Sequence, residues 1–264
     1  MNGIFNPHIY IRTITIVGLG GTGAQVARLA GRMAYAMREN RQHVPRIILI
    51  DPDRVEESNV GRQLFAPGDV GQFKVEVVGR RLNLALGLDV AWIPEMVNAE
   101  RHFERQGGNL VISCVDNHLG RAELHKVEGI LIGTGNHAES GQVCIGNTAD
   151  RDLLSRHLAE ERTEYPYLPR EGLLFPGLLM AEDGSESQPG ITDDRSCAEL
   201  AVSGEQSLLV NDWMACIVGQ YLYRLLQRQP ITTFLTYILT TELVVRSLPI
   251  NREEISACLQ LEPG

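Results

Sequence analysis

The sequence has little of what marks secreted, disulfide-rich or zinc-binding proteins. It contains five cysteines in 264 residues, an odd number without a Cys-x-x-Cys pair, so neither a disulfide framework nor a paired-thiolate zinc site is expected. The first residues, Met1 to His8, have neither a basic nor an apolar segment, and no secretory signal is predicted. We therefore expect a cytoplasmic protein.

Positive charge and long apolar runs are also scarce. The chain has 24 Lys and Arg against 33 Asp and Glu, a formal net charge of −9. Such a balance is unsuited to neutralising nucleic-acid phosphates or anionic lipid, so neither nucleic acid nor membrane is an expected partner. The most apolar long stretch, 208–226, contains Asn211, Asp212 and Arg224, which a lone membrane span tolerates poorly. It predicts a buried or amphipathic helix.

What the sequence does contain begins with a strand, a glycine-rich turn and a helix. β-branched residues run from Thr13 to Val17, and an alanine-rich helical pattern extends to about Arg38. The turn between them contains Gly18, Gly20, Gly21, Thr22 and Gly23. Glycines let backbone N–H groups approach a bound anion closely, and a helix N-terminus adds partial positive charge. The turn therefore predicts a phosphate-binding site.

A second predicted strand, Arg46 to Ile50, ends in Asp51-Pro-Asp53. An acidic residue at this position bonds the ribose hydroxyls in βαβ nucleotide sites, so Asp51 and Asp53 are candidates for that role. The same pattern suits an NAD(P)-dependent oxidoreductase. Two structural alternatives stay open: the glycines can serve close helix–strand packing, and the aspartates can cap a loop.

The residues after Asp53 form a longer motif. It reads Val55-Glu-Glu-Ser-Asn59-Val-Gly-Arg62-Gln63, Phe65, Asp69-Val-Gly71 and Lys74, followed later by Ser113-Cys-Val-Asp116-Asn117 and Gly141-Gln-Val143. With the glycine turn and the two aspartates, this series resembles the ThiF/MoeB/HesA family of adenylyltransferases, which are related to ubiquitin-activating enzymes. The resemblance is continuous over about residues 1–150.

The resemblance implies ATP-dependent activation of a carboxylate. The carboxylate attacks the α-phosphate of ATP and gives an acyl-adenylate and pyrophosphate. Its source would be the C-terminus of a ubiquitin-like or sulfur-carrier protein with a β-grasp fold, and the enzyme would act as a homodimer with ATP and Mg²⁺ as cofactors. Backbone amides at Gly20, Gly21 and Thr22 would lie along the phosphates, and Asp51 and Asp53 would hold the ribose.

The family's charged residues also carry over to matching positions. Arg62 and Lys74 would offset negative charge on the phosphates, and Asp116 would coordinate Mg²⁺. Further hydrogen bonds to the nucleotide would come from Asn59, Gln63 and Asn117. Each has a structural alternative: Asn59 as a turn residue, Arg62 or Lys74 as a surface charge, and Asp116 as the N-cap of the next helix.

Cys197 is the candidate nucleophile. The segment before the C-terminal helix reads Cys197-Ala-Glu199, where many relatives have a Cys-Ala-Glu whose thiolate receives the acyl group. Arg195 and a helix start just after the thiol would lower its pKa. A buried helix cysteine is the alternative. The other cysteines are expected in the core, for Cys114, Cys144 and Cys216, or in the tail, for Cys258.

The expected fold is α/β and Rossmann-like: a mostly parallel sheet with helices on both faces, extended by antiparallel strands at the C-terminal side. One ThiF-like domain would span 1–264, with a nucleotide-binding half (1–150), a mobile crossover segment (151–196), and a C-terminal helix and strands (197–264). Within the crossover, a charged helical stretch to about Glu161 is predicted, and residues 163–195 are expected to be exposed and partly mobile. Residues 1–12 are predicted to be irregular. Asp51 and Asp116 would face one crevice from the ends of different strands.

The chain departs from its relatives in three respects. It has no Arg-Tyr-x-Arg-Gln segment near the N-terminus and no pairs of zinc-binding cysteines, and neither a ubiquitin-fold nor a rhodanese domain is expected after the catalytic core. In size it is similar to the compact stand-alone ThiF-like proteins of bacterial mobile-element operons, such as the PRTRC group. A nucleotide-binding scaffold that has lost catalysis is a further alternative.

Overall fold

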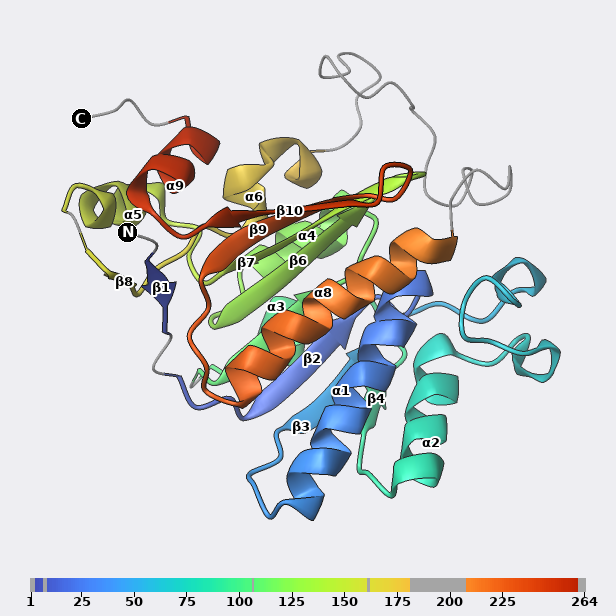
Figure 1. The fold of residues 1–264 in the computed structure, drawn as a ribbon. Helices are drawn as coiled ribbons and strands as arrows, with labels where there is room; N and C mark the ends of the chain where they lie inside the picture. Colours follow the sequence, from blue (N-terminus) through green and yellow to red (C-terminus); the bar gives the residue numbers. More distant parts are fainter. Residues whose placement is uncertain (1–2, 7–8, 106, 161, 181–207, 261–264) are drawn as a thin grey trace.

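The computed structural model describes residues 3–6, 9–105, 107–160, 162–180 and 208–260. An eight-stranded sheet runs through the molecule in the order β10-β9-β7-β6-β5-β2-β3-β4 (Figure 1). Its parallel strands are β2 (Thr13–Val17), β3 (Arg46–Ile50), β4 (Ala91–Ile93), β5 (Asn109–Ser113) and β6 (Ile130–Asn136). All residues of β2 and β5 are buried, as expected for central parallel strands with both faces covered.

Three antiparallel strands extend this sheet: β7 (Ser140–Gly146), β9 (Thr233–Leu239) and β10 (Val244–Pro249). The Rossmann-like class and the antiparallel extension predicted from the sequence are therefore confirmed. β6 is longer than the apolar run Ile130 to Ile132 indicates, because Gly133 to Gly135 continue the strand. A Cβ at Gly133 would lie 2.0 Å from Oε2 of Glu171, so a glycine there permits the close approach of a buried side chain.

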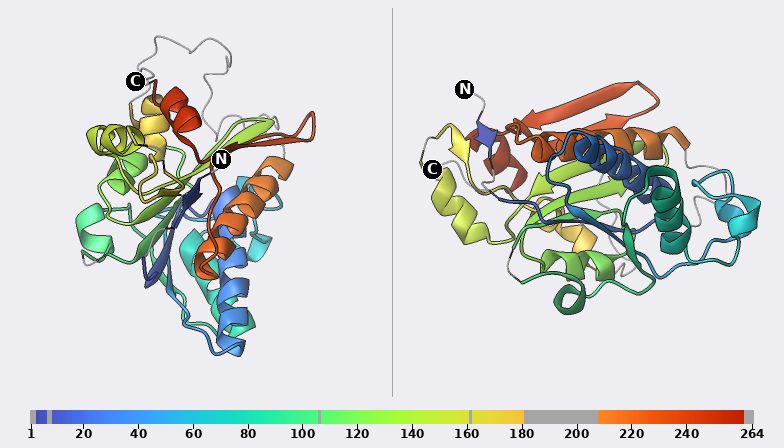
Figure 2. Two further views of the ribbon diagram at one scale, coloured as in Figure 1. Left: turned by 60° about the vertical axis from the view of Figure 1, so that its left-hand side comes forward. Right: turned by 90° about the horizontal axis from the view of Figure 1, so that it is seen from below.

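Helices cover both faces of the sheet (Figure 2). On one face lie α1 (Gly21–Glu39), α2 (Lys74–Leu86) and α8 (Leu208–Leu226). The other face carries α3 (Ala99–His102), α4 (His118–His125) and α6 (Glu171–Leu174). Helices α5 (Arg151–Leu158) and α9 (Arg252–Cys258) lie at the end of the molecule that holds the N-terminus (Figure 1). α1 and α8 pack side by side, and both begin at the same edge of the sheet (Figure 1).

Two segments expected to be irregular or exposed contain ordered, buried structure. The lead-in contains β1 (Ile4–Phe5), which pairs in parallel with β8 (Glu164–Tyr165). The prediction of an exposed segment over 163–195 is wrong for its first part, where Leu168, Arg170 and Glu171 are buried. The prolines and the acidic run that starts at Ala181 suggested an exposed loop, but Arg170 and Glu171 have buried partners elsewhere in the chain. Residues 181–195 lie outside the described part.

The cysteine predictions are correct only in part. Cys144 is buried as expected, but Cys216 is exposed. The buried residues of α8 include Val210, Met214 and Val218, and Cys216 falls on the opposite side of the helix. Cys258 closes α9 and is half-buried, rather than lying in a tail. Cys197 lies outside the described residues.

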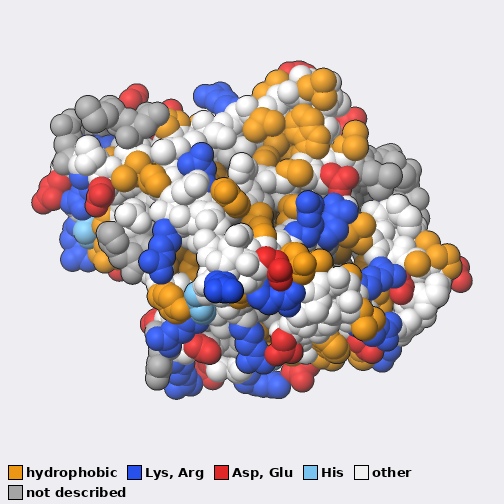
Figure 3. Space-filling model, turned by 60° about the horizontal axis from the view of Figure 1, so that its bottom comes forward, with side chains coloured by type: hydrophobic (Ala, Val, Ile, Leu, Met, Phe, Trp, Pro, Cys, Tyr) orange, Lys and Arg blue, Asp and Glu red, His pale blue; other side chains and the backbone are white. Residues whose placement is uncertain are grey.

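Exposed hydrophobic side chains lie on the β9–β10 hairpin. Leu243 is 74% exposed and Val245 is 53% exposed, and Figure 3 shows hydrophobic side chains gathered toward the top of the view, with charged side chains scattered below them. None of the helices in the described ranges is both long and apolar enough to cross a membrane.

Candidate functional site

A pocket of about 430 Å³ lies at the carboxyl ends of β2, β3, β5 and β6. In the sheet, β3 lies on one side of β2 and β5 on the other. The connections from β2 therefore change direction at this point, and open α/β sheets bind ligands at such a switch point. The predicted residues that line it are Gly18, Gly20, Gly21, Thr22, Asp51, Asp53, Asn59, Arg62, Gln63, Lys74, Asp116 and Asn117. The sheet thus brings together residues from four separate segments, as the sequence predicts for Asp51 and Asp116.

The glycine turn is built by close backbone contacts. Gly18 has φ +86°, and a Cβ there would lie 2.5 Å from the carbonyl oxygen of Cys114. A Cβ at Gly23 would lie 1.8 Å from the carbonyl oxygen of Gly18. Helix α1 begins immediately at Gly21, with no acidic residue in its first turn, and its N-cap residue, Gly20, forms no side-chain capping hydrogen bond. Because the first N–H groups of a helix have no partner within it, this end is suited to an anion.

Asp51 holds the glycine turn in place through hydrogen bonds to the backbone. Its side chain is buried, and its two oxygens accept hydrogen bonds from the backbone N–H groups of Leu19 and, at 2.7 Å, of Asp53. Burial raises the pKa of Asp51, whereas the two backbone hydrogen bonds oppose that rise. The carboxylate therefore joins the end of β3 to the end of β2. This is the loop-capping alternative noted for the aspartates, and it leaves Asp53 as the more accessible acid.

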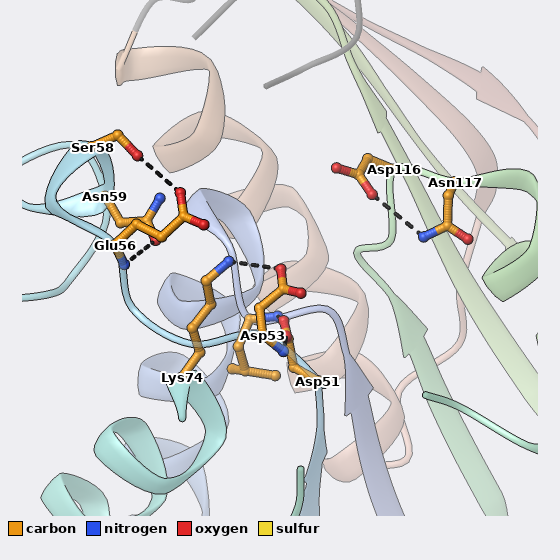
Figure 4. Close-up of polar contacts among 9 residues, drawn as sticks. Asp51, Asp53, Glu56, Ser58, Asn59, Lys74, Asp116 and Asn117 are labelled. Carbon is orange, nitrogen blue, oxygen red and sulfur yellow. Dashed lines mark hydrogen bonds and ion pairs between the residues drawn. The ribbon is translucent and has the colours of Figure 1, made fainter. Parts of the chain in front are cut away.

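Asp53 and Lys74 form an ion pair on the pocket wall, with 2.9 Å between Lys74 Nζ and Asp53 Oδ2 (Figure 4). The Lys74 backbone N–H also donates to the Asp53 carbonyl oxygen at 2.9 Å. Lys74 is buried, while the Asp53 side chain is 61% exposed. Lys74 stands in the first turn of α2, where a positive charge opposes the helix dipole. Its position is therefore not explained by helix stability.

Asn59 has a local structural role. Its Oδ1 accepts the backbone N–H of Glu56 at 3.0 Å, and the Ser58 hydroxyl donates to Glu56 Oε2 at 3.4 Å (Figure 4). These bonds shape the short 3₁₀ helix Glu57–Asn59. The turn-residue alternative thus explains the hydrogen bond made by the side-chain Oδ1 of Asn59. The residue also lines the pocket.

Arg62 and Gln63 follow this turn, and both are half-buried in the pocket wall. The Oε1 atom of Gln63 is buried and has no hydrogen-bond partner among the described residues. Buried acceptors in native proteins almost always have a hydrogen-bond partner, so a donor group on a bound molecule or a water would be expected to bond to Gln63 Oε1. This makes Gln63 a candidate contact for a ligand.

Asp116 lies across the pocket from Lys74 and is exposed (Figure 4). Asn117, not Asp116, is the N-cap of α4, because its Oδ1 accepts the N–H of Gly120 at 2.8 Å. This corrects the capping alternative for Asp116. The Asn117 Nδ2 lies 3.5 Å from Asp116 Oδ1. The Asp116 carboxylate therefore keeps oxygens available at the pocket.

The donor set fits a magnesium ion held together with a phosphate ligand. Mg²⁺ is usually bound through one or two carboxylates plus phosphate oxygens and waters, and Asp116 supplies one exposed carboxylate at the pocket. Among the described residues, no group of three or more His, Cys, Asp or Glu side chains forms a metal cage. Asp116 is thus the residue that would hold the ion.

Sequence reasoning missed one wall of the pocket, which is formed by the end of β6 and the first turn of α8. Thr134, Asn136 and Asn211 line the pocket. Asn211 accepts the Thr22 hydroxyl at 2.9 Å, although the two residues are 189 positions apart. The only signal in the sequence was a polar residue inside an apolar stretch. The segment 95–97 also reaches the pocket and was not singled out.

A buried ion pair between Arg121 and Glu171 packs behind the pocket wall formed by the end of β6. Arg121, which lies in α4, places its guanidinium 2.9 Å from Glu171 Oε2 and donates to the Thr134 carbonyl oxygen at 3.0 Å. Burial raises the pKa of Glu171, and the nearby Arg121 opposes that rise.

Burial also raises the pKa of Cys114, which lines the same pocket, to about 12. This thiol therefore stays protonated and is a poor nucleophile.

Comparisons with known proteins identify relatives in sequence. The ubiquitin-like modifier-activating enzyme 5 of Drosophila erecta is 29% identical over 190 residues, which cover 63% of this chain and 45% of that protein. The enzyme of the same name from Culex quinquefasciatus is 31% identical over 140 residues, or 47% of this chain and 33% of that protein. The chain thus spans less than half the length of these relatives.

Solved structures share the fold. The structure of E. coli MccB with ATP matches with a TM-score of 0.57 and 16% identity, covering 94% of this chain and 65% of MccB. The structure of MccB with MccA-N7isoASN gives a TM-score of 0.57, 17% identity and coverages of 94% and 66%. At this identity the likeness concerns the fold alone. The ThiF family profile, however, matches residues 9–258, and we conclude that the chain belongs to the ThiF family.

Proposed function

We propose that this protein uses ATP to adenylate the C-terminal carboxylate of a ubiquitin-like or sulfur-carrier protein. One observation carries the proposal: a single pocket combines the uncapped start of α1, the cations Arg62 and Lys74, and the exposed carboxylate of Asp116. In the reaction, a carboxylate oxygen attacks the α-phosphorus, a new P–O bond forms, and the bond to the β-phosphate oxygen breaks. Pyrophosphate leaves with that electron pair.

The residues of the pocket divide this work. Backbone N–H groups at Gly21 and Thr22 bind phosphate oxygens, and Arg62 and Lys74 offset the negative charge that shifts onto them. Asp53 is the acid that we assign to the ribose, since its carboxylate is the exposed one of the two aspartates.

Asp116 would hold Mg²⁺, which when bound neutralises phosphate charge. Asn117 positions the Asp116 loop by capping α4, and Gln63 and Asn59 lie on the opposite wall, where they contribute polar contacts.

Two other functions make different demands on the pocket. An NAD(P)-dependent oxidoreductase would use the turn and an acid after β3, but both oxygens of Asp51 are bonded to the backbone, and Arg62, Lys74 and Asp116 would have no role. A silent scaffold would bind the nucleotide without turnover. The same pocket residues would bind the nucleotide in a scaffold and in an adenylyltransferase, so only a measurement of activity separates these two functions.

ATP–pyrophosphate exchange tests the proposal. The purified protein is incubated with ATP, Mg²⁺, labelled pyrophosphate and a panel of β-grasp carrier proteins, each with a free C-terminal carboxylate or with that carboxylate amidated. We expect exchange only with a free carboxylate. ATP binding without exchange across the panel would favour the scaffold, and tight NAD(P) binding would favour the oxidoreductase.

Transfer of the acyl group to Cys197 is a separate step of the proposal. The thiolate would attack the acyl carbon of the adenylate, form a thioester and release AMP. Cys197→Ala should leave exchange intact and remove any thiol-sensitive adduct with the carrier. Cys216→Ala is the matched control, because Cys216 is exposed on α8. An adduct that persists in Cys197→Ala would reject this step.

We also propose that the protein acts as a homodimer. Sedimentation equilibrium should give twice the mass of the chain at micromolar concentration. A monomer at concentrations where exchange is fully active would contradict the proposal.

A further inference from the structure

Asn211 reaches the nucleotide pocket from a helix that the phosphate-binding motif does not include. It lies in the first turn of α8 and is 8% exposed. α8 packs beside α1, and the two helices start at the same edge of the sheet (Figure 1). The described part of α8 therefore lies beside the glycine turn, with Asn211 facing the start of α1.

The orientation of the Asn211 carboxamide is set by two donors. Its Oδ1 accepts the Thr22 hydroxyl at 2.9 Å and the Asn136 Nδ2 group at 2.9 Å. An amino group that approaches at this distance requires an acceptor, so the oxygen of Asn211 is the atom that faces Asn136. The amino group of Asn211 must then point elsewhere.

That amino group lies against the start of α1. A Cβ built on Gly21 would lie 2.5 Å from Asn211 Nδ2, so Nδ2 occupies the space where a side chain at position 21 would stand. Both residues line the pocket. The Nδ2 group carries two N–H donors, and it stands beside the backbone N–H groups that suit an anion.

We propose that Asn211 Nδ2 donates a hydrogen bond to a phosphate oxygen of the bound nucleotide, alongside the N–H groups of Gly21 and Thr22. The inference rests on the ATP-binding part of the proposed function and adds a nucleotide contact from the second half of the chain. It also explains why position 21 is a glycine: any larger residue would displace the Asn211 amino group from the phosphate side of the turn.

Asn211→Asp tests the assignment with a change of nearly equal size. Aspartate keeps an oxygen for Thr22 and Asn136 but replaces the amino group with a negatively charged oxygen, which repels phosphate. We expect the ATP affinity measured by titration calorimetry to fall at least tenfold, while the affinity for adenosine, which has no phosphate, stays at the wild-type value. A purely structural role for Asn211 would lower both affinities together.

Asn251→Asp is the matched control. It adds the same charge at the N-cap of α9, where aspartate caps as well as asparagine, and it should leave both affinities unchanged. Asn211→Ala provides a second test if the aspartate variant does not fold: the uncharged loss of the donor should lower ATP affinity several-fold and spare adenosine. Wild-type ATP affinity in the folded variants, or equal loss of ATP and adenosine, would overturn the assignment.

The same measurements separate this inference from the proposed function. If the wild type binds ATP without exchanging pyrophosphate with any carrier, and Asn211→Asp loses ATP selectively, adenylation fails and the phosphate contact stands. If exchange occurs and Asn211→Asp binds ATP normally, only the contact fails. A wild type that does not bind ATP would reject both.

Discussion

Lys74 and Asp116 show how single charged residues define the chemistry of this pocket. Lys74 is buried in the first turn of α2 and forms an ion pair with the exposed Asp53, while Asp116 is exposed on the other side of the pocket (Figure 4). Neither arrangement stabilises the fold strongly: the lysine opposes its helix dipole, and the aspartate is not the helix cap. Their positions support the proposal that the pocket binds ATP together with Mg²⁺.

At the residue scale, we expect Asp116→Ala and Arg62→Ala each to reduce ATP–pyrophosphate exchange at least 100-fold. For Asp116→Ala the midpoint of thermal unfolding should stay close to the wild-type value, because substitutions of exposed residues usually change stability by less than about 0.5 kcal/mol. Asp152→Ala, on the exposed side of α5, is the control and should retain full exchange. Retained exchange in Asp116→Ala would contradict the assignment of this carboxylate.

The Arg121–Glu171 pair leads to an expectation about stability rather than activity. Glu171→Ala leaves the Arg121 guanidinium buried without its carboxylate partner, which should lower the free energy of unfolding by about 3–5 kcal/mol. Urea denaturation would measure this loss. Glu76→Ala removes an exposed pair with Arg80 at 3.7 Å and should cost at most about 1 kcal/mol. Equal effects of the two changes would show that burial is not the cause.

At the scale of elements, α4 and α6 are linked through His125. Its Nε2 accepts the backbone N–H of Gly172 at 3.0 Å, and this bond requires the neutral imidazole. Burial lowers the pKa of His125 to about 4, with further lowering from the positive charges of Arg170 and Arg121. Between pH 6.5 and pH 4 the unfolded chain therefore takes up a proton that the folded protein does not, and folding loses stability as the pH falls through this range.

His125→Gln should reduce this acid sensitivity. A glutamine oxygen can accept the Gly172 N–H without titrating, so the difference in unfolding free energy between pH 7 and pH 4 should shrink relative to the wild type. The change should be smaller than about 3 kcal/mol, because solvent screens the partly exposed imidazole. Urea midpoints measured across that pH range provide the comparison. An unchanged slope would mean that the folded and unfolded states bind protons at this position equally.

Elements whose determinants are local could be predicted from the sequence. The strand ending at Val17, the glycine turn and α1 follow from neighbouring residues, and so do β3 and the start of α2 at Lys74. The pairing of β1 with β8 and the contact between Thr22 and Asn211 join residues far apart in the chain, and no local pattern encodes them. The roles of Asp51 and Asn59 were also beyond local patterns, because an acid or amide in a loop can face either a ligand or the backbone.

At the scale of the whole molecule, the pocket is assembled from both halves of the chain. Strands β2, β3 and β5 and helix α1 come from the first half, and Asn211 on α8 comes from the second. A ligand that contacts both halves should stabilise the protein against global unfolding.

We expect ATP with Mg²⁺, at about 100 times its dissociation constant, to raise the free energy of unfolding by about 2.7 kcal/mol. For a chain of this size, that increase should raise the midpoint of thermal unfolding by about 5–10 °C. NAD⁺ at the same concentration is the control and should produce no comparable increase. A larger shift with NAD⁺ would favour the oxidoreductase alternative.

The carboxylate of Asp51 spans the ends of two neighbouring strands and keeps the glycine turn in one conformation before any nucleotide arrives. The glycine turn therefore already has its binding conformation when a molecule enters the pocket, and binding does not have to order it. Less entropy is lost on association than with a disordered loop, so the rate of nucleotide capture should depend on diffusion and charge rather than on a slow rearrangement of this turn.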